Sequence, residues 1–188
     1  MAHFFENHPL IDFDLLKNNK PRTIKNPLVR YKLRDVLSNR TAMYYTHTVE
    51  EGQTAQFIAD RFYGDVTLDW VIYKVNEIID PMFEWPLDYN PFINFVKAKY
   101  GSIGSAQGTR HHYEWKYQDK QILFDGTIVP QKYFEVDAET YAGLPVDQKR
   151  EVSNYTYEEE RNDARRQIRV LDSVHLNTLL DEAESIFE

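Results

Sequence analysis

Residues 45–64, YTHTVEEGQTAQFIADRFYG, carry a dense set of folding signals. The first five residues favour a β-strand, and Glu51-Gly52 after them is a turn signal. Thr54 is placed to cap a helix, because its hydroxyl can accept a hydrogen bond from an N–H group of the first turn. One face of that helix is apolar and would be buried, through Ala55, Ile58, Ala59 and Phe62. Gly64 supplies the left-handed residue at which helices commonly end.

A second helix is predicted directly after Gly64, because the same one-sided spacing returns. Its apolar face consists of Leu68, Val71, Ile72 and Val75. The helix closes at Asn76, and Ile78-Ile79 are predicted to form a return strand. The order strand, helix, helix, strand defines a small βααβ module.

The segments on either side of this module are simpler. Residues 1–27 are polar and contain three prolines, which predicts an extended arm with at most one short helix. Residues 28–37 have the spacing of a one-sided helix. Residues 92–100 predict another short helix, and the Gly/Ser-rich run 101–108 predicts a flexible loop or a domain joint.

The next part of the chain is predicted to be mostly strand and loop. Residues 111–136 alternate and turn at Asp125-Gly126, which predicts a β-hairpin or meander. Residues 137–150 are loop-like, with one glycine and one proline. Residues 157–166 are charged and helix-prone, and residues 167–171 alternate like a strand.

The C-terminal end predicts an amphipathic helix capped by Asp172 or Ser173. Its apolar face consists of Leu176, Leu179, Leu180, Ala183 and Phe187. The fold class is therefore α+β: a βααβ module with an N-terminal arm and helix, a β-hairpin region, and a C-terminal strand plus helix. We expect four segments, namely residues 1–43, 44–100, 101–150 and 151–188.

Composition and charge exclude several classes of protein. The net charge is −8, and the only basic surplus lies in the first 50 residues, so a duplex nucleic-acid binder is not expected. The chain has no cysteine, which removes disulfides and thiolate chemistry. The N-terminus has no signal-peptide pattern, and no apolar run approaches the length of a membrane span, so we expect synthesis in the cytoplasm and no membrane partner.

Residues 45–64 resemble a LysM module. Such modules open with a Tyr-Thr-Val-type strand, a Gly-Asp-Thr turn and a helix with an Ile-Ala pair, here Ile58-Ala59. The sequence departs from the pattern at Gln53, where aspartate is usual, and at Asn76-Glu77, where Asn-Pro is usual. LysM modules generally bind glycans that contain N-acetylglucosamine.

A wider resemblance covers residues 28–187. Trp70-Val71-Ile72, Asp80-Pro81 and Trp85-Pro86, followed by Asn154-Tyr155-Thr156 and Arg165 to Leu171, are similar to the baseplate wedge protein of contractile-tailed (myovirus) phages. Residues 101–150 match this family only in character. The resemblance implies a structural subunit of the virion's tail baseplate, with a LysM-like core, that clamps neighbouring wedges and binds other wedge proteins. It implies no enzyme activity and no cofactor.

The sequence offers little that resembles a catalytic or metal site. On a regular strand His111 and His112 point to opposite faces, which leaves only His112 and Glu114 on one side, and a catalytic zinc needs three protein ligands. Exposed strand histidines are therefore the favoured interpretation. No nucleophile elbow or phosphate-binding glycine loop is present, so we predict no catalytic, cofactor-binding or metal-binding residue.

Aromatic and apolar residues instead mark candidate interfaces. With 13 Tyr, 11 Phe and 3 Trp the chain is rich in side chains that dominate interface energetics, although they are equally suited to a core. We expect Trp70 in the core and Trp85 at the edge of the module. The interface candidates are Trp85, Phe83, Tyr89, Leu176, Leu180 and Phe187.

One alternative function remains open at this point. A glycan-binding module of a tail-associated protein would need an exposed groove around Gln53 and Asn76–Ile79. A cell-wall hydrolase is a third possibility, but 30 acidic residues make pairs of carboxylates unavoidable and uninformative.

Overall fold

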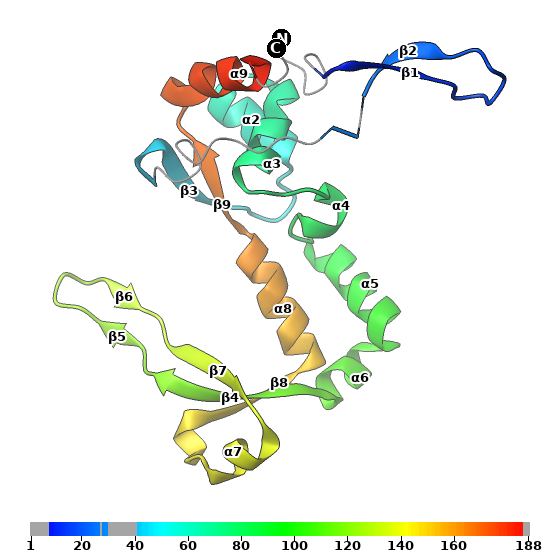
Figure 1. The fold of residues 1–188 in the computed structure, drawn as a ribbon. Helices are drawn as coiled ribbons and strands as arrows, with labels where there is room; N and C mark the ends of the chain where they lie inside the picture. The colour runs from blue at the N-terminus through cyan, green and yellow to red at the C-terminus, as the bar shows by residue number, and fades with distance from the viewer. Residues whose placement is uncertain (1–7, 27, 30–40, 186–188) are drawn as a thin grey trace. The chain divides into compact units, whose positions relative to one another are not determined.

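A computed structural model of the protein describes residues 8–26, 28–29 and 41–185 (Figure 1). The described part is a mixed α+β fold with short helices and several small antiparallel sheets. It forms two compact units, unit 1 within residues 1–86 and 165–188 and unit 2 within residues 87–164. These units cut across the four segments expected from the sequence, and that four-part division stays a prediction. The helix predicted at 28–37 falls almost entirely outside the described residues.

Unit 1 contains two small antiparallel sheets and a group of helices. Its elements are β1 (Leu10–Phe13), β2 (Arg22–Lys25), the 3-10 helix η1 (Thr41–Met43), β3 (Tyr44–Thr48), α2 (Ala55–Tyr63), η2 (Val66–Leu68), α3 (Asp69–Val75), α4 (Pro81–Glu84), β9 (Gln167–Leu171), η4 (Ser173–His175) and α9 (Leu176–Ser185). The arm predicted at the N-terminus is thus a hairpin over its described residues, because β1 pairs with β2.

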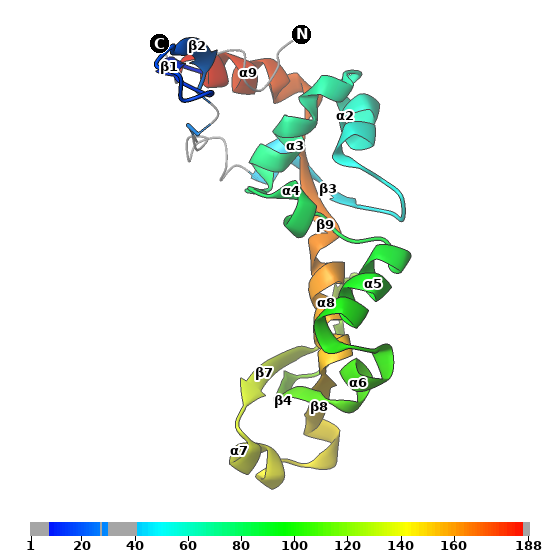
Figure 2. The ribbon, with the colours of Figure 1, turned by 90° about the vertical axis from the view of Figure 1, so that its right-hand side faces the viewer.

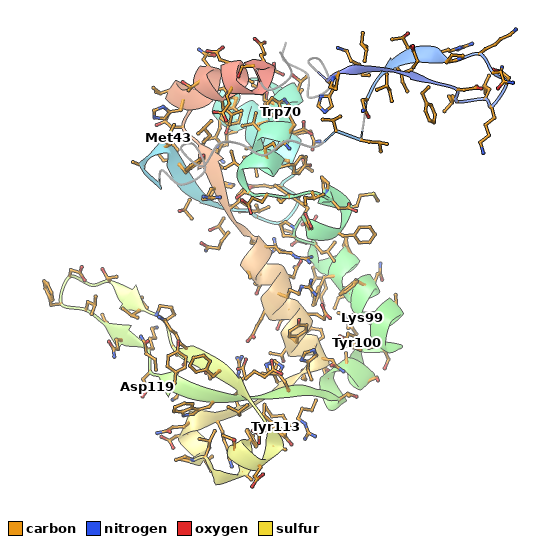
Figure 3. All side chains as sticks on the ribbon, viewed as in Figure 1. Met43, Trp70, Lys99, Tyr100, Tyr113 and Asp119 are labelled. Atoms are coloured by element: carbon orange, nitrogen blue, oxygen red, sulfur yellow. The ribbon has the colours of Figure 1, made fainter. Side chains whose placement is uncertain are left out.

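The first part of the predicted module is confirmed. β3 is followed by α2, whose cap Thr54 accepts a hydrogen bond from the N–H of Phe57 at 3.2 Å. Gly64 ends the helix in the left-handed conformation, with φ at 71°, which a side chain would make costly. α3 follows and ends at Asn76 as predicted. Trp70 is buried in the core of unit 1, as expected, and Met43 lies in the same core (Figure 3).

The return strand is not where the sequence placed it. Ile78-Ile79 form no strand, so that prediction is wrong; β3 pairs instead with β9, with Tyr44 opposite Leu171. Glu77 adopts a left-handed conformation, φ 57°, directly after α3 and turns the chain out of a strand path. The N–H of Ile79 then donates to the carboxylate of Glu84, the last residue of α4, at 2.6 Å. The strand–helix–helix–strand order is kept, but its last strand is supplied about 90 residues later.

The side chain of Asn76 hydrogen-bonds to the outer edge of β9, which is the edge that faces away from β3. Its amide oxygen accepts the N–H of Arg169 at 2.8 Å, and its amide nitrogen donates to the carbonyl of the same residue at 2.8 Å. The nitrogen also donates to the carbonyl of Ile72 at 2.8 Å, inside α3. One amide thus pairs with both backbone groups of one strand residue, as a neighbouring strand would.

Unit 2 contains helices and a three-stranded sheet with a long hairpin. Its elements are α5 (Tyr89–Tyr100), α6 (Ile103–Gly108), β4 (Arg110–Gln118), β5 (Gln121–Ile122), β6 (Ile128–Val129), β7 (Lys132–Val136), α7 (Ala138–Gly143), η3 (Val146–Gln148), β8 (Lys149–Ser153) and α8 (Asn154–Arg165). The strand order is β7-β4-β8, and β5 pairs with β6 at the far end of the hairpin.

Two loops predicted from composition are ordered elements. The run 101–108 contains α6, because Ser102 caps it by accepting from the N–H of Ser105 and Ala106 is buried. Residues 137–150 contain α7, capped by Asp137, and the beginning of β8. Glycine and proline content alone therefore gave the wrong assignment in both places.

α5 and α8 lie side by side in both views of the ribbon (Figures 1 and 2). Phe92 meets Tyr155 edge-on at 5.7 Å between ring centroids, and Lys99 and Tyr100 both donate to the buried carboxylate of Glu158. Burial alone would raise the pKa of Glu158, but these two hydrogen bonds and the positive charges of Lys99 and Arg161 together outweigh it, and the pKa is lowered.

A second asparagine makes the same pair of hydrogen bonds in unit 2, to a residue that lies outside any strand. Asn162 of α8 accepts the N–H of Leu87 at 2.7 Å and donates to its carbonyl at 2.9 Å. The two ends of unit 2 are therefore held together by a pair of hydrogen bonds.

Candidate interaction surfaces

The α4 patch, defined as Ile79, Met82 and Phe83, is a cluster of exposed apolar side chains on a short rigid turn. Phe83 is 74% exposed and Met82 83% exposed. Asp80 caps the turn by accepting from the N–H of Met82, while Glu84 accepts the N–H groups of Asp80 and Ile79. The two hydrogen bonds to the Glu84 carboxylate, that from Asp80 first, lower its pKa. The turn thus presents Phe83 in a fixed place, consistent with its prediction as an interface residue.

Trp85 lies at the edge of unit 1, half-buried. Its indole N–H donates to the carbonyl of Gln53 at 3.1 Å, and its ring meets Tyr73 edge-on at 5.8 Å. Part of its surface therefore packs within the unit, and only the remainder is open to a partner.

The other predicted interface residues differ in exposure. Tyr89, on α5, is 65% exposed. Leu176 and Leu180 are half-buried and pack against the core of unit 1. Phe187 lies outside the described residues. An interface role for these six residues stays a prediction.

The hairpin tip, defined as Ile122, Leu123, Phe124 and Ile128, is a second apolar patch. Phe124 is fully exposed. The turn that carries it is held by hydrogen bonds from the N–H of Gly126 to the carbonyl of Leu123 and from the N–H of Leu123 to the carbonyl of Thr127. Behind the tip, Tyr117 and Phe134 stack with centroids 4.5 Å apart and remain largely exposed.

The arm, defined as β1, β2 and their connecting turn, exposes a third apolar set. Its exposed members are Leu10, Phe13, Leu15, Leu16 and Ile24. The turn is ordered by Asp14, whose carboxylate accepts the N–H groups of Asn18 and Asn19. Monomeric proteins rarely expose several apolar patches of this kind unless other molecules cover them.

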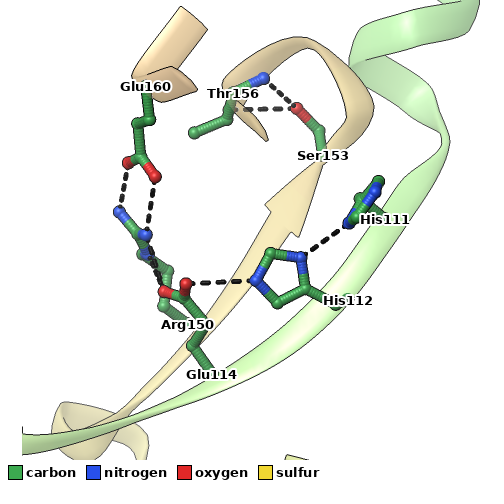
Figure 4. A network of polar contacts seen from close by, with 7 residues as sticks. All are labelled: His111, His112, Glu114, Arg150, Ser153, Thr156 and Glu160. Atoms are coloured by element: carbon green, nitrogen blue, oxygen red, sulfur yellow. Dashed lines mark hydrogen bonds and ion pairs between the residues drawn. The ribbon is translucent and has the colours of Figure 1, made fainter. Parts of the chain in front are cut away.

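A polar network links β4, β8 and α8 (Figure 4). His112 contacts His111 through their Nδ1 atoms at 2.8 Å and Glu114 through Nε2 at 3.1 Å. Arg150 bridges the carboxylates of Glu114 and Glu160. This network ties the sheet to the helix that follows it.

The expectation that His111 and His112 point to opposite faces is wrong. The pairing of β4 with β8 shifts register between Arg110 and His112, and such a bulge turns one side chain out of the regular alternation. His111 thereby stacks on Tyr157 with centroids 3.8 Å apart. Across the described residues, no group of three or more histidine, cysteine or acidic side chains is arranged to hold a metal ion.

Comparison with protein families identifies the family of the chain. The family model described as "Base plate wedge protein 53" matches residues 14–186, which is nearly the whole sequence. The chain belongs to this family. No curated protein matches it.

Family membership settles the broad function. The protein is a structural subunit of a phage baseplate wedge, not an enzyme, and its partners are other baseplate proteins. Among the helices of the described residues, none is long and apolar enough to span a membrane. The exposed apolar patches of the wedge subunit agree with a role in assembly.

Sequence reasoning missed the hairpin tip as an exposed apolar surface. A signal was present at the tip, since apolar residues stand on both sides of Asp125-Gly126 without the polar alternation of a solvent-exposed strand. The apolar cluster of the arm at Leu10, Ile11, Phe13, Leu15 and Leu16 is evident in the sequence, but its prolines predicted an extended segment and not the hairpin that carries the cluster.

Proposed function

We propose that this wedge subunit clamps neighbouring wedges together during baseplate assembly. The observation that carries the proposal is the presence of three separate apolar patches: the α4 patch, the hairpin tip and the arm. The α4 patch and the hairpin tip are carried on short elements whose backbone is already fixed by hydrogen bonds, and the arm is a short hairpin. A subunit with several such patches can bind more than one partner at once.

Preorganisation of the α4 patch and the hairpin tip favours binding. A tip whose turn is already formed loses little conformational freedom when it docks, so more of the apolar burial appears as affinity. Truncating one well-packed aromatic anchor in an interface commonly costs about 2 kcal/mol or more. Phe83 and Phe124 are the side chains best placed to act as anchors.

We further propose that β3, α2, α3 and β9 form a LysM-like module interrupted by unit 2. The order of elements, the Thr54 cap and the left-handed Gly64 support this. The module would then serve as the rigid core to which the binding elements are attached.

Glycan binding, the alternative function, is less well supported. Its groove would lie around Gln53 and Asn76–Ile79. The carbonyl of Gln53 already accepts the Trp85 indole, and the Gln53 side chain bonds to His47 and Glu50. The Asn76 amide is occupied by Arg169, so polar groups that would face a sugar are satisfied within the chain.

Co-purification with neighbouring baseplate proteins tests the clamp. Wild-type chain should co-purify with other wedge proteins, whereas Phe83→Ser and Phe124→Ser should each reduce recovery. Val146→Ser is the matched control, because Val146 is also highly exposed but lies on a separate 3-10 helix. Equal recovery of all three variants would contradict the proposal, and saturable binding of the free chain to insoluble peptidoglycan would favour the alternative.

A further inference from the structure

The two edges of the β3–β9 sheet differ in whether their outward backbone groups have hydrogen-bond partners within the described residues. The register and the bonds from Val49 N to Arg166 O and from Asp172 N to Met43 O fix which residues bond across the sheet. In an antiparallel ladder, alternate residues direct their N–H and C=O groups outward. On β9 the outward groups include those of Arg169, which Asn76 pairs.

On β3 the outward groups include those of Thr46 and Thr48. Both residues are exposed, and within the described part of the chain neither backbone has a hydrogen-bond partner across this edge. Natural proteins protect such edges with lysine, proline, a bulge or a covering element. The sequence of β3, YYTHT, contains no lysine or proline and pairs without a bulge. Among the described residues nothing covers the β3 edge at Thr46 and Thr48, so these two positions offer a template for another strand.

The arm, in turn, is a hairpin that a further strand would stabilise. It is an isolated two-stranded hairpin with strands of four residues, which is marginal in water unless more strands or a helix support it. The bond from Asn26 N to Pro9 O sets its ladder, so Thr23 of β2 directs its backbone groups outward. β2 is exposed along its whole length.

Charge selects which strand of the arm fits. β2 and the turn before it carry Lys20 and Arg22, whereas β1 carries Asp12. β3 leads directly into Glu50 and Glu51. An antiparallel pairing of Thr23 with Thr48 places Arg22 opposite Val49 and Lys20 opposite Glu51, so the basic residues lie beside these two carboxylates. The equivalent pairing of Asp12 with Thr48 places Leu10 and Pro9 there and gains no such attraction.

We propose that the arm of one copy adds β2 to the open edge of β3 in a second copy. The contact is head-to-tail, so it links successive copies into a ring or chain, as adjoining wedges would require. The inference rests on the proposed clamp function and names a direct contact between two clamp subunits. Main-chain hydrogen bonds supply the affinity, as in other cases of strand addition.

Disulfide trapping tests the contact in the full-length chain, which has no natural cysteine. Thr23→Cys and Thr48→Cys chains are mixed and oxidised; directly opposed strand residues lie within reach of a disulfide. Because docking raises the local thiol concentration, this pair should give at least about tenfold more crosslinked dimer than Thr23→Cys mixed with Thr127→Cys, an exposed control. Equal yields from the two mixtures would overturn the proposal.

A proline variant separates edge pairing from general association. Thr46→Pro removes an outward N–H without removing a bond between β3 and β9, so it should abolish the specific crosslink in a Thr48→Cys background. Thr46→Lys, which keeps the backbone, covers the case in which the proline variant unfolds and should also reduce the crosslink. Undiminished crosslinking in a folded variant would overturn the proposal. Co-purification with other wedge proteins but no Thr23–Thr48 crosslink would leave the clamp function intact and refute only this contact.

Discussion

Replacing Asn76 by alanine should destabilise unit 1 through loss of a strand-like contact. The side chain makes three hydrogen bonds, two to the backbone of Arg169 and one to the carbonyl of Ile72. Each is worth about 1 kcal/mol net. Because Asn76 is only half-buried, water replaces part of the loss, and we expect the free energy of unfolding to fall by about 2 kcal/mol. That corresponds to a melting temperature lower by about 4–8 °C for a chain of this size.

Calorimetry and hydrogen exchange provide the assay. The amide of Arg169 should exchange faster in Asn76→Ala, because its acceptor is gone. Asn76→Asp keeps an acceptor for that amide but loses both donated bonds, so it should protect Arg169 partly while lowering stability. Asn90→Ala is the matched control, since Asn90 is exposed on α5. A stability loss below about 0.5 kcal/mol, the range of ordinary surface substitutions, would refute the reasoning.

Three further outcomes follow from single residues. Glu158→Gln should lower the free energy of unfolding at neutral pH and flatten its dependence on pH in acid. The Lys99 and Tyr100 hydrogen bonds lower the pKa of Glu158, so the stabilisation by this carboxylate is present above the ordinary pKa of 4.5 and is lost as pH falls through the lowered pKa. Unfolding measured over an acid pH series checks this. Gly64→Ala should cost about 1 kcal/mol in urea unfolding, because the helix ends there at φ 71°. Phe124→Ser should leave the melting temperature unchanged but weaken binding to its partner about 30-fold, measured by titration calorimetry, if the tip is an anchor worth about 2 kcal/mol.

Signals that act over a few residues were readable from the sequence. The Thr54 cap, the apolar spacing of α2 and the left-handed Gly64 each depend on contacts within one or two turns, and all three were confirmed. The strand at residues 167–171 was also confirmed. Such features depend on covalent geometry and periodicity, which a single sequence contains.

Features that depend on distant residues were not readable. β9 replaced the local candidate Ile78-Ile79 because pairing with β3 is decided by the whole core, not by the apolar run itself. The bulge that brings His111 against His112 depends on the register of β8, which was not recognised as a strand. The amide of Asn76 has no signature in the sequence, because its partner Arg169 is 93 positions away.

Pairing β3 with β9, which lies about 90 residues after α3, costs chain entropy, and the hydrogen bonds of Asn162 reduce that cost. Closing a loop of about 90 residues rather than about 5 costs roughly 2.5 kcal/mol more, because closure entropy grows with the logarithm of length. Asn162 holds Leu87 by two hydrogen bonds and so joins the two ends of unit 2. With unit 2 folded, only about 16 residues between Asn76 and β9 remain free to be closed, which recovers roughly 1.5 kcal/mol of that cost. Folding of unit 2 therefore stabilises the β3–β9 sheet through chain connectivity: Asn162 joins the ends of the insertion, and Asn76 pairs with the strand that follows it.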